Sequence, residues 1–192
     1  KDNSNNEKYI VDFKKLKSEN SDVVAYIKVN NTNIEYPIVK TSNNNFYLNH
    51  SFDKSKNSRG WIFADYKNKF DNTDKNIVIY GHNMRDESMF GSLKNILNEE
   101  WYNNAENKNI TFLTEKGNYI YKVFSIYKIE SEDYYIKTNF KNDEDYEKFL
   151  NTIKNRSIKN FDINLNINDK IITLSTCANN NKYRIVLHAK KL

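Results

Sequence analysis

The prediction of the fold starts from the stretch Ile171-Ile172-Thr173-Leu174-Ser175-Thr176-Cys177. Its first four residues are apolar or β-branched, which is typical of a buried strand. It ends on the single cysteine of the sequence, and a second strand-like run opens after a short polar loop with Tyr183-Arg184-Ile185-Val186. We therefore expect two neighbouring strands, 170–176 and 183–189, that bring a thiol and an arginine together.

Cys177 is the first candidate functional residue. Side chains alternate between the two faces of a strand, so Thr173, Ser175 and Cys177 share a polar face, while Ile172 and Leu174 point the other way. A thiol at a strand end, on a polar face and before a polar loop, favours a nucleophile for acyl chemistry. A buried structural thiol remains the alternative, because free cysteine often packs as a small hydrophobic residue.

Arg184 is the second candidate. An unperturbed thiol has a pKa of about 8.5, so a nearby cation is needed to favour the thiolate. Arg184 follows Cys177 across a short loop, and pairing of the two strands would bring its guanidinium to the thiol. This group stays protonated, so it could hold a substrate carbonyl or a developing oxyanion, but it could not relay a proton. An ordinary surface arginine at a strand start is the alternative.

A histidine is then needed to carry the proton, and the sequence offers three. His82, in Tyr80-Gly81-His82-Asn83-Met84, follows a buried strand-like run and emerges at a strand end, as the cysteine does. His188 lies four residues beyond Arg184, about 13 Å further along a strand at about 3.3 Å per residue. His50 lies in a polar loop. The pattern favours His82, and the other two remain alternatives.

The rest of the chain predicts a β-rich fold. Apolar spacing favours helices at 7–18, 88–97 and, after the capping residue Asn142, at 142–155. Strand-like runs total about eight and do not alternate with helices, which favours an antiparallel barrel or sandwich with helical insertions over a doubly wound parallel sheet. Besides the two strands above, the runs lie at 23–29, 34–39, 61–63, 76–80, 110–113 and 119–129.

Composition excludes several function classes. The 192 residues suit one domain, and the net charge of +5 comes from 30 basic and 25 acidic residues interspersed along the chain. A single-stranded nucleic-acid binder would concentrate its basic residues in one stripe, so this class is disfavoured. One cysteine and isolated histidines provide no metal site, and we expect no cofactor. No window approaches the roughly 18 to 20 apolar residues that span a bilayer.

Two motifs together resemble the class B sortases. The first is Thr173-Leu174-Ser175-Thr176-Cys177 followed by an arginine that opens the next strand, and the second is Tyr80-Gly81-His82-Asn83-Met84 with Ser88-Met89-Phe90-Gly91-Ser92-Leu93. The run at 31–37, the N-terminal helix and the helix at 142–155 are also similar. The resemblance covers nearly the whole chain and implies one catalytic domain over 1–192, an eight-stranded sortase barrel with an N-terminal helical extension at 1–20.

The resemblance also implies a cysteine transpeptidase that anchors secreted proteins to the Gram-positive cell wall. Cys177 would attack the threonine carbonyl of a C-terminal sorting signal and form a thioester, His82 would protonate the leaving amine, and Arg184 would stabilise the carbonyl oxygen. An amino group of a peptidoglycan precursor would then resolve the thioester, without a metal. The membrane anchor of the family would lie outside this sequence, which begins on a polar stretch.

Positions in the substrate groove are also implied by the resemblance. They are Asn44, Leu48, Tyr80, Ser175, Tyr135 and Ile136. The chain departs from many class B members after the cysteine, where Ala178-Asn179 stands in place of an acidic residue. A non-catalytic peptide-binding barrel, and a sortase that acts mainly as a hydrolase or a pilin polymerase, remain alternative functions.

Overall fold

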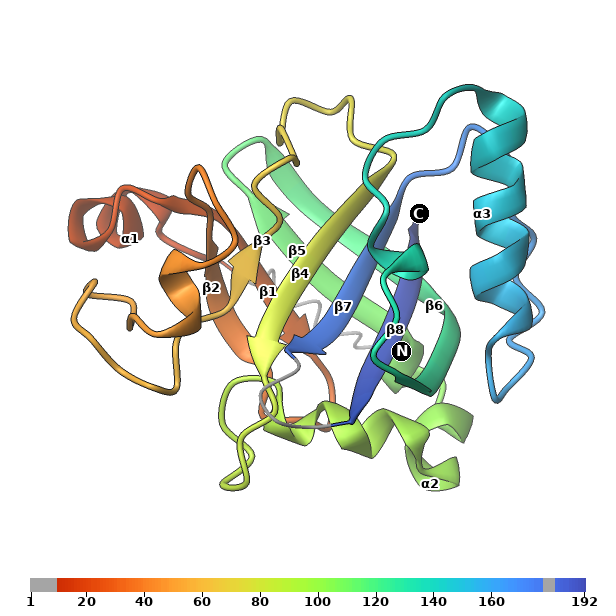
Figure 1. Cartoon of the computed structure of the whole chain (residues 1–192), viewed down its shortest axis with the longest axis horizontal. Coiled ribbons are helices and arrows are strands. Elements are labelled where there is room, and N and C mark those ends of the chain that lie inside the picture. Colours follow the sequence, from red (N-terminus) through yellow and green to blue (C-terminus); the bar gives the residue numbers. More distant parts are fainter. Residues whose placement is uncertain (1–9, 178–181) are drawn as a thin grey trace, which may run out of the picture.

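Eight strands close into a barrel in the computed structural model, which describes residues 10–177 and 182–192. Around the barrel the strands follow the order β1-β2-β3-β4-β7-β8-β6-β5 (Figure 1). The predicted fold class is confirmed. The strands are β1 (Val23–Val29), β2 (Glu35–Val39), β3 (Phe63–Ala64), β4 (Asn76–His82), β5 (Asn109–Thr114), β6 (Gly117–Glu130), β7 (Ile171–Cys177) and β8 (Tyr183–Lys191).

Helical segments cover the outside and one end of this barrel. Three are α-helices: α1 (Phe13–Glu19), α2 (Glu99–Asn103) and α3 (Asp143–Asn155). Four are 3₁₀ turns: η1 (Phe46–Leu48), η2 (Gly91–Leu97), η3 (Glu106–Lys108) and η4 (Tyr134–Ile136).

Two strand pairs are parallel, which corrects the expectation of an antiparallel sheet. They are β2 with β3, and β4 with β7. Parallel neighbours need a long crossover, and here the chain between β4 and β7 supplies β5, β6 and α3. Since β4 and β7 run in the same direction, their C-terminal ends meet at one rim of the barrel, as Figure 1 shows.

Alternation along each strand fills the barrel with aliphatic side chains. On β7, Ile172 and Leu174 join the interior cluster, as the sequence predicts, and Ile79 on β4 and Leu187 on β8 lie in the same cluster. All four are fully buried. Burial of one such side chain contributes about 1.5–3 kcal/mol, so this interior fixes the register of the strands and the direction of the residues between.

Helix α3 covers the outer face of the barrel beside β6, β7 and β8, and its prediction is confirmed (Figure 1). The Asn142 side chain caps it by accepting from the backbone N–H of Asp145, and three acidic residues in the first turn complement the helix dipole. Its buried face consists of Tyr146, Phe149, Leu150 and Ile153.

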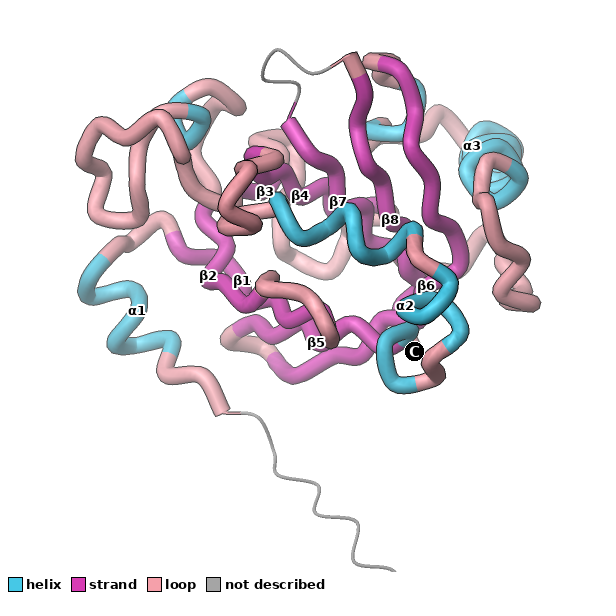
Figure 2. The backbone as a smooth tube through the Cα atoms, turned by 90° about the horizontal axis from the view of Figure 1, so that it is seen from below, coloured by secondary structure: helices cyan, strands magenta, loops and turns pink. Residues whose placement is uncertain are grey.

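The α-helix expected at 88–97 is wrong. The segment forms the 3₁₀ turn η2, and the α-helix α2 after it was not predicted. Asn98 lies between the two with extended backbone angles and interrupts the helix. The apolar side chains of this region pack into the barrel: Leu93, Ile96 and Trp101 belong to the interior cluster. The segment lies across the lower end of the barrel (Figure 2).

The N-terminal helix begins later than predicted. It starts at Phe13, with the Asp12 carboxylate accepting from the N–H of Lys15. Ile10, expected on its apolar face, precedes the helix and is 83% exposed. Residues 1–9 of the predicted extension lie outside the described part of the chain. No helix among the described residues is both long and apolar enough to cross a membrane.

Candidate active site

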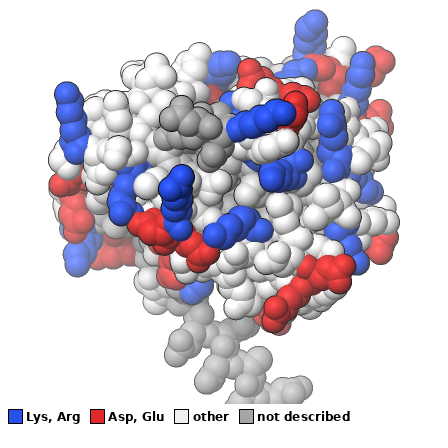
Figure 3. All heavy atoms as spheres, turned by 60° about the horizontal axis from the view of Figure 1, so that its bottom comes forward, with Lys and Arg blue, Asp and Glu red and all other residues white. Residues whose placement is uncertain are grey.

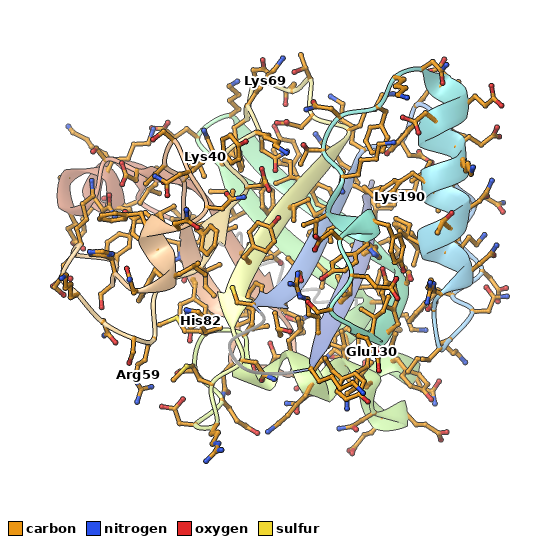
Figure 4. All side chains as sticks on the ribbon, viewed as in Figure 1. Lys40, Arg59, Lys69, His82, Glu130 and Lys190 are labelled. Atoms are coloured by element: carbon orange, nitrogen blue, oxygen red, sulfur yellow. The ribbon has the colours of Figure 1, made fainter. Side chains whose placement is uncertain are left out.

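The ends of β4 and β7 bring His82 and Cys177 together. The two strands pair in parallel from Asn76 with Ile171 through to His82 with Cys177. Neighbouring strands lie about 4.8 Å apart, and residues paired across a ladder project to the same face. His82 and Cys177 therefore lie side by side on the outer face, and Figure 4 shows His82 at the end of β4, beside the end of β7.

Arg184 comes from the strand on the other side of β7. The antiparallel ladder of β7 and β8 reaches Ser175 opposite Val186, and the same register continued by two residues places Arg184 opposite Cys177. Its Nη2 donates to Ser131 Oγ at 3.0 Å, and its Nη1 lies 3.8 Å from the carboxylate of Asp133. Two consecutive strands, β7 and β8, and the distant strand β4 thus place thiol, guanidinium and imidazole at one rim.

The thiol is buried, and burial controls its ionisation. Cys177 is 8% exposed, and desolvation raises the pKa of its thiol to about 12, although the charge of Arg184 opposes this rise. The guanidinium favours the thiolate, as the sequence predicts, but the effect of burial is larger. At neutral pH the sulfur therefore carries its proton, and a nearby base must accept that proton when the sulfur reacts.

The backbone of η1 orients His82. The imidazole Nε2 lies 2.5 Å from the carbonyl oxygen of Leu48, and since a carbonyl can only accept, Nε2 carries a proton in this contact. Gly60 makes the close packing possible. It has a φ of +61°, and a Cβ there would lie 2.2 Å from Tyr47 O and 3.0 Å from Cδ2 of His82. The sequence indicated neither Gly60 nor a role for the Leu48 carbonyl.

The predicted groove residues lie on both sides of these strand ends. On one side, Asn44 Nδ2 and the Tyr80 hydroxyl both donate to Asp65 Oδ2, at 3.0 and 2.9 Å. Asp65 is a buried carboxylate that sequence reasoning missed, because it follows a strand of only two residues. Burial and the adjacent carboxylate raise the pKa of Tyr80. Leu48 is half-buried and packs against the cluster that contains Tyr80 and Cys177.

On the other side, η4 supplies Tyr135 and Ile136. The hydroxyl groups of Tyr135 and Ser175 are hydrogen-bonded at 2.9 Å, and both side chains are fully buried. These two side chains therefore lie below the surface and hold η4 against β7. Ile136 is half-buried and packs against the cluster that contains Cys177. The six predicted groove positions thus lie on β4 and β7 and in the segments beside their ends, and their contact with substrate stays a prediction. Tyr135 and Ile136 are called the η4 wall below.

The other two histidines have separate surroundings. His50 stacks on Phe46, with ring centroids 4.0 Å apart, and its Nδ1 contacts the Phe46 carbonyl at 2.7 Å. His188 is fully buried and pairs with Thr173, well before the end of β7. Of the three, His82 is the one that pairs with Cys177.

Comparison with known proteins decides the family. The family model described as "Sortase domain" matches residues 27–192. The chain belongs to the sortase family. Sortase B of Staphylococcus aureus (strain NCTC 8325 / PS 47) is 38% identical over 181 residues, which cover 93% of this chain and 73% of the relative. The match to class B confirms the resemblance seen in the two motifs.

Comparison with solved structures leads to the same family. The crystal structure of Clostridium perfringens sortase B is 43% identical, with a TM-score of 0.86 over 93% of this chain and 98% of that one. A Staphylococcus aureus sortase B–substrate complex is 38% identical, with a TM-score of 0.87 over 94% of this chain and 84% of that one. The chain is thus a cell-wall sorting transpeptidase, a cysteine enzyme of the cell surface.

One face of this sortase carries mixed charge. Figure 3 shows positive and negative side chains interspersed on one face of the molecule. Within 10–177 and 182–192, no group of three or more histidine, cysteine, aspartate or glutamate residues could hold a metal ion. Ala178 and Asn179, where the chain departs from many class B members, lie outside the described residues.

The buried thiol predicts a steep pH dependence of alkylation. We expect the rate of Cys177 alkylation by iodoacetamide to rise about tenfold per pH unit from pH 7 towards pH 11, because the thiolate is the reactive form. Tandem mass spectrometry of the peptide that contains Cys177, the one cysteine of the chain, measures this rate separately from lysine alkylation at high pH. The urea-unfolded sortase is the control, and its rate should level off above about pH 9. A plateau of the native rate below pH 9 would contradict the raised pKa of the thiol.

Proposed function

We propose that this sortase cleaves a C-terminal sorting signal after threonine and transfers the acyl group through a thioester on Cys177. The observation that carries the proposal is the register of the parallel pair, which sets His82 beside Cys177. A thiol with a pKa of about 12 needs a partner to take its proton, and the paired imidazole is the adjacent titratable group that suits this role.

The first half of the reaction breaks the peptide bond. The sulfur of Cys177 forms a bond to the threonine carbonyl carbon while its proton passes to His82. The carbonyl oxygen becomes an oxyanion, and collapse of the tetrahedral intermediate expels the amine of the next residue, which takes the proton from His82. The thioester on Cys177 remains.

Arg184 is proposed to stabilise the oxyanion. Among the described residues, its Nε is buried and has no hydrogen-bond partner, so a donor is available near the thiol. Its ion pair with Asp133 is weak, because that carboxylate is 83% exposed and such pairs contribute about 0–1 kcal/mol. Loss of the Asp133 ion pair would therefore cost little when the guanidinium binds a substrate oxygen.

The second half transfers the acyl group. An amine of a peptidoglycan precursor attacks the thioester carbonyl and gives a proton to His82. The sulfur leaves as the new amide bond forms, and it takes that proton from His82 to regenerate the thiol. The Staphylococcus aureus relative was solved as a substrate complex, which supports binding of a sorting-signal substrate by this fold. The acceptor and a membrane anchor outside this sequence belong to the same proposal, and both rest on the family.

A peptide library tests the proposal. The sortase is incubated with peptides in which one threonine is fixed and its neighbours are randomised, with and without triglycine as the amine. We expect intact-mass spectrometry to show an acyl adduct on Cys177 that ends at threonine, and ligated product when triglycine is present. Products that remain hydrolysed at high triglycine would favour the hydrolase alternative. No adduct and no cleavage across the library would refute the proposal.

A further inference from the structure

Five hydrogen-bonded groups cross the outer face of the barrel beneath α3 and η4. The Tyr127 hydroxyl lies 2.7 Å from His188 Nε2, and His188 Nδ1 lies 2.8 Å from Thr173 Oγ1. Thr173 Oγ1 lies 2.8 Å from Asn76 Oδ1, and Asn76 Nδ2 lies 2.9 Å from the carbonyl oxygen of Lys137. This series of hydrogen bonds thus links β6, β8, β7 and β4 to the segment that follows η4.

The last contact sets the direction of every bond. The Lys137 carbonyl can only accept, so the Asn76 amide nitrogen faces it and the amide oxygen faces Thr173. Thr173 has one hydroxyl proton and donates it to Asn76, so it accepts from His188 Nδ1–H. Neutral His188 then accepts at Nε2 from the Tyr127 hydroxyl. Each of the three inner side chains uses one donor and one acceptor, and any break leaves buried polar atoms unpaired.

The neutral form of His188 suits this role. The imidazole is fully buried, and desolvation lowers its pKa to about 3, so it stays uncharged across the neutral range. Its ring also packs against aromatic neighbours, with centroid distances of 5.5 Å to Tyr127 and 6.4 Å to Tyr135. The proposed reaction has no use for this buried titratable group.

The η4 wall, Tyr135 and Ile136, lies next to the last group in this series of hydrogen bonds, the Lys137 carbonyl. Tyr135 and Ile136 immediately precede Lys137, whose carbonyl is bound to the barrel through Asn76. The ammonium of Lys137 binds the Asp145 carboxylate of α3 at 2.6 Å. Lys137 is therefore fixed from two sides, by the barrel through its backbone and by the helix through its side chain.

We propose that His188 and Thr173 are positioning residues, which hold the η4 wall of the substrate groove in place through Asn76 and the Lys137 carbonyl. The inference deepens the proposed function and rests on it for the identity of the groove. It also explains the first threonine of the cysteine motif. Thr173 joins the buried histidine to the wall, and Cys177 lies further along the same face of β7.

The test compares Thr173→Val with Thr173→Ser. Valine keeps the shape of the side chain and removes the hydroxyl group, whereas serine retains the hydroxyl. We expect Thr173→Val to speed hydrogen–deuterium exchange in residues 131–141. With the best peptide from the threonine-fixed library, it should raise KM about fivefold or more while kcat changes less than about twofold. Thr173→Ser should restore both readouts.

Two further variants make the result decisive. Ile110→Val, a buried β5 substitution away from the groove, controls for general loss of stability and should alter neither the exchange of 131–141 nor KM. Tyr127→Phe removes only the terminal hydroxyl group, so it should show the same effects to a smaller degree, and it decides the test if Thr173→Val does not fold.

The exchange measurement needs no substrate, so it decides the inference even if no library peptide is processed and the proposed function fails. Unchanged exchange of 131–141 in Thr173→Val would overturn the proposal. The same change in Ile110→Val, or a loss confined to kcat, would overturn it as well.

Discussion

Replacement of Cys177 by alanine is expected to abolish transpeptidation, with a fall in rate of about 10⁴-fold or more, because no other group can form the thioester. The fold should survive. Cys177 is the last residue of β7, and loss of one sulfur atom leaves only a small cavity.

Cys177→Ser is the matched variant for this prediction. It keeps a hydroxyl group in place of the thiol, but an alcohol is far less ionised, so the rate should also fall steeply. Single-turnover cleavage of the selected library peptide measures the effect, and circular dichroism against temperature checks the fold. More than about 1% of the native rate in a folded Cys177→Ala preparation would show that the nucleophile lies elsewhere.

Replacement of Arg184 by methionine is expected to lower kcat/KM by about 10²–10³-fold, the usual cost of removing one oxyanion donor. It should also raise the pKa of the Cys177 thiol further, because the charge of Arg184 lowers that pKa in the native protein. Both effects have one cause, the loss of a positive charge beside the sulfur. The measurements are steady-state cleavage of the selected peptide and the alkylation profile against pH.

Two variants separate charge from geometry at this position. Arg184→Lys keeps the charge and loses the planar fork of donors, so we expect an intermediate rate and a nearly native alkylation profile. Asp133→Asn removes the exposed partner of Arg184, and we expect a change of less than about threefold. If Arg184→Met retained native kcat/KM, the oxyanion would have to be stabilised by another donor.

Local patterns in the sequence predicted the parts of the fold that depend on local physics. The apolar run of β7 and the capped, amphipathic α3 were both identified, because alternation and capping act over a few residues. The segment at 88–97 shows the limit of such patterns. Its helical spacing is real, but it reflects contact with the open end of the barrel, and Asn98 ends the helical run in an extended conformation.

Local patterns also predicted some residues of the candidate site and not others. The strand-end pattern pointed to Cys177 and His82, because each follows an apolar run. The buried state of His188 could not be predicted, since α3 and η4 cover it from elsewhere in the chain. The contact between His82 and the Leu48 carbonyl could not be predicted either, because every residue has a backbone carbonyl and the sequence does not distinguish one from another.

The parallel pairing of β4 with β7 also bears on how the enzyme becomes active. About half of the chain lies between His82 and Cys177, and the entropy of closing so long a loop makes this contact slow to form. The catalytic arrangement therefore exists only when these two distant segments have paired, and a chain in which β4 and β7 are unpaired lacks it.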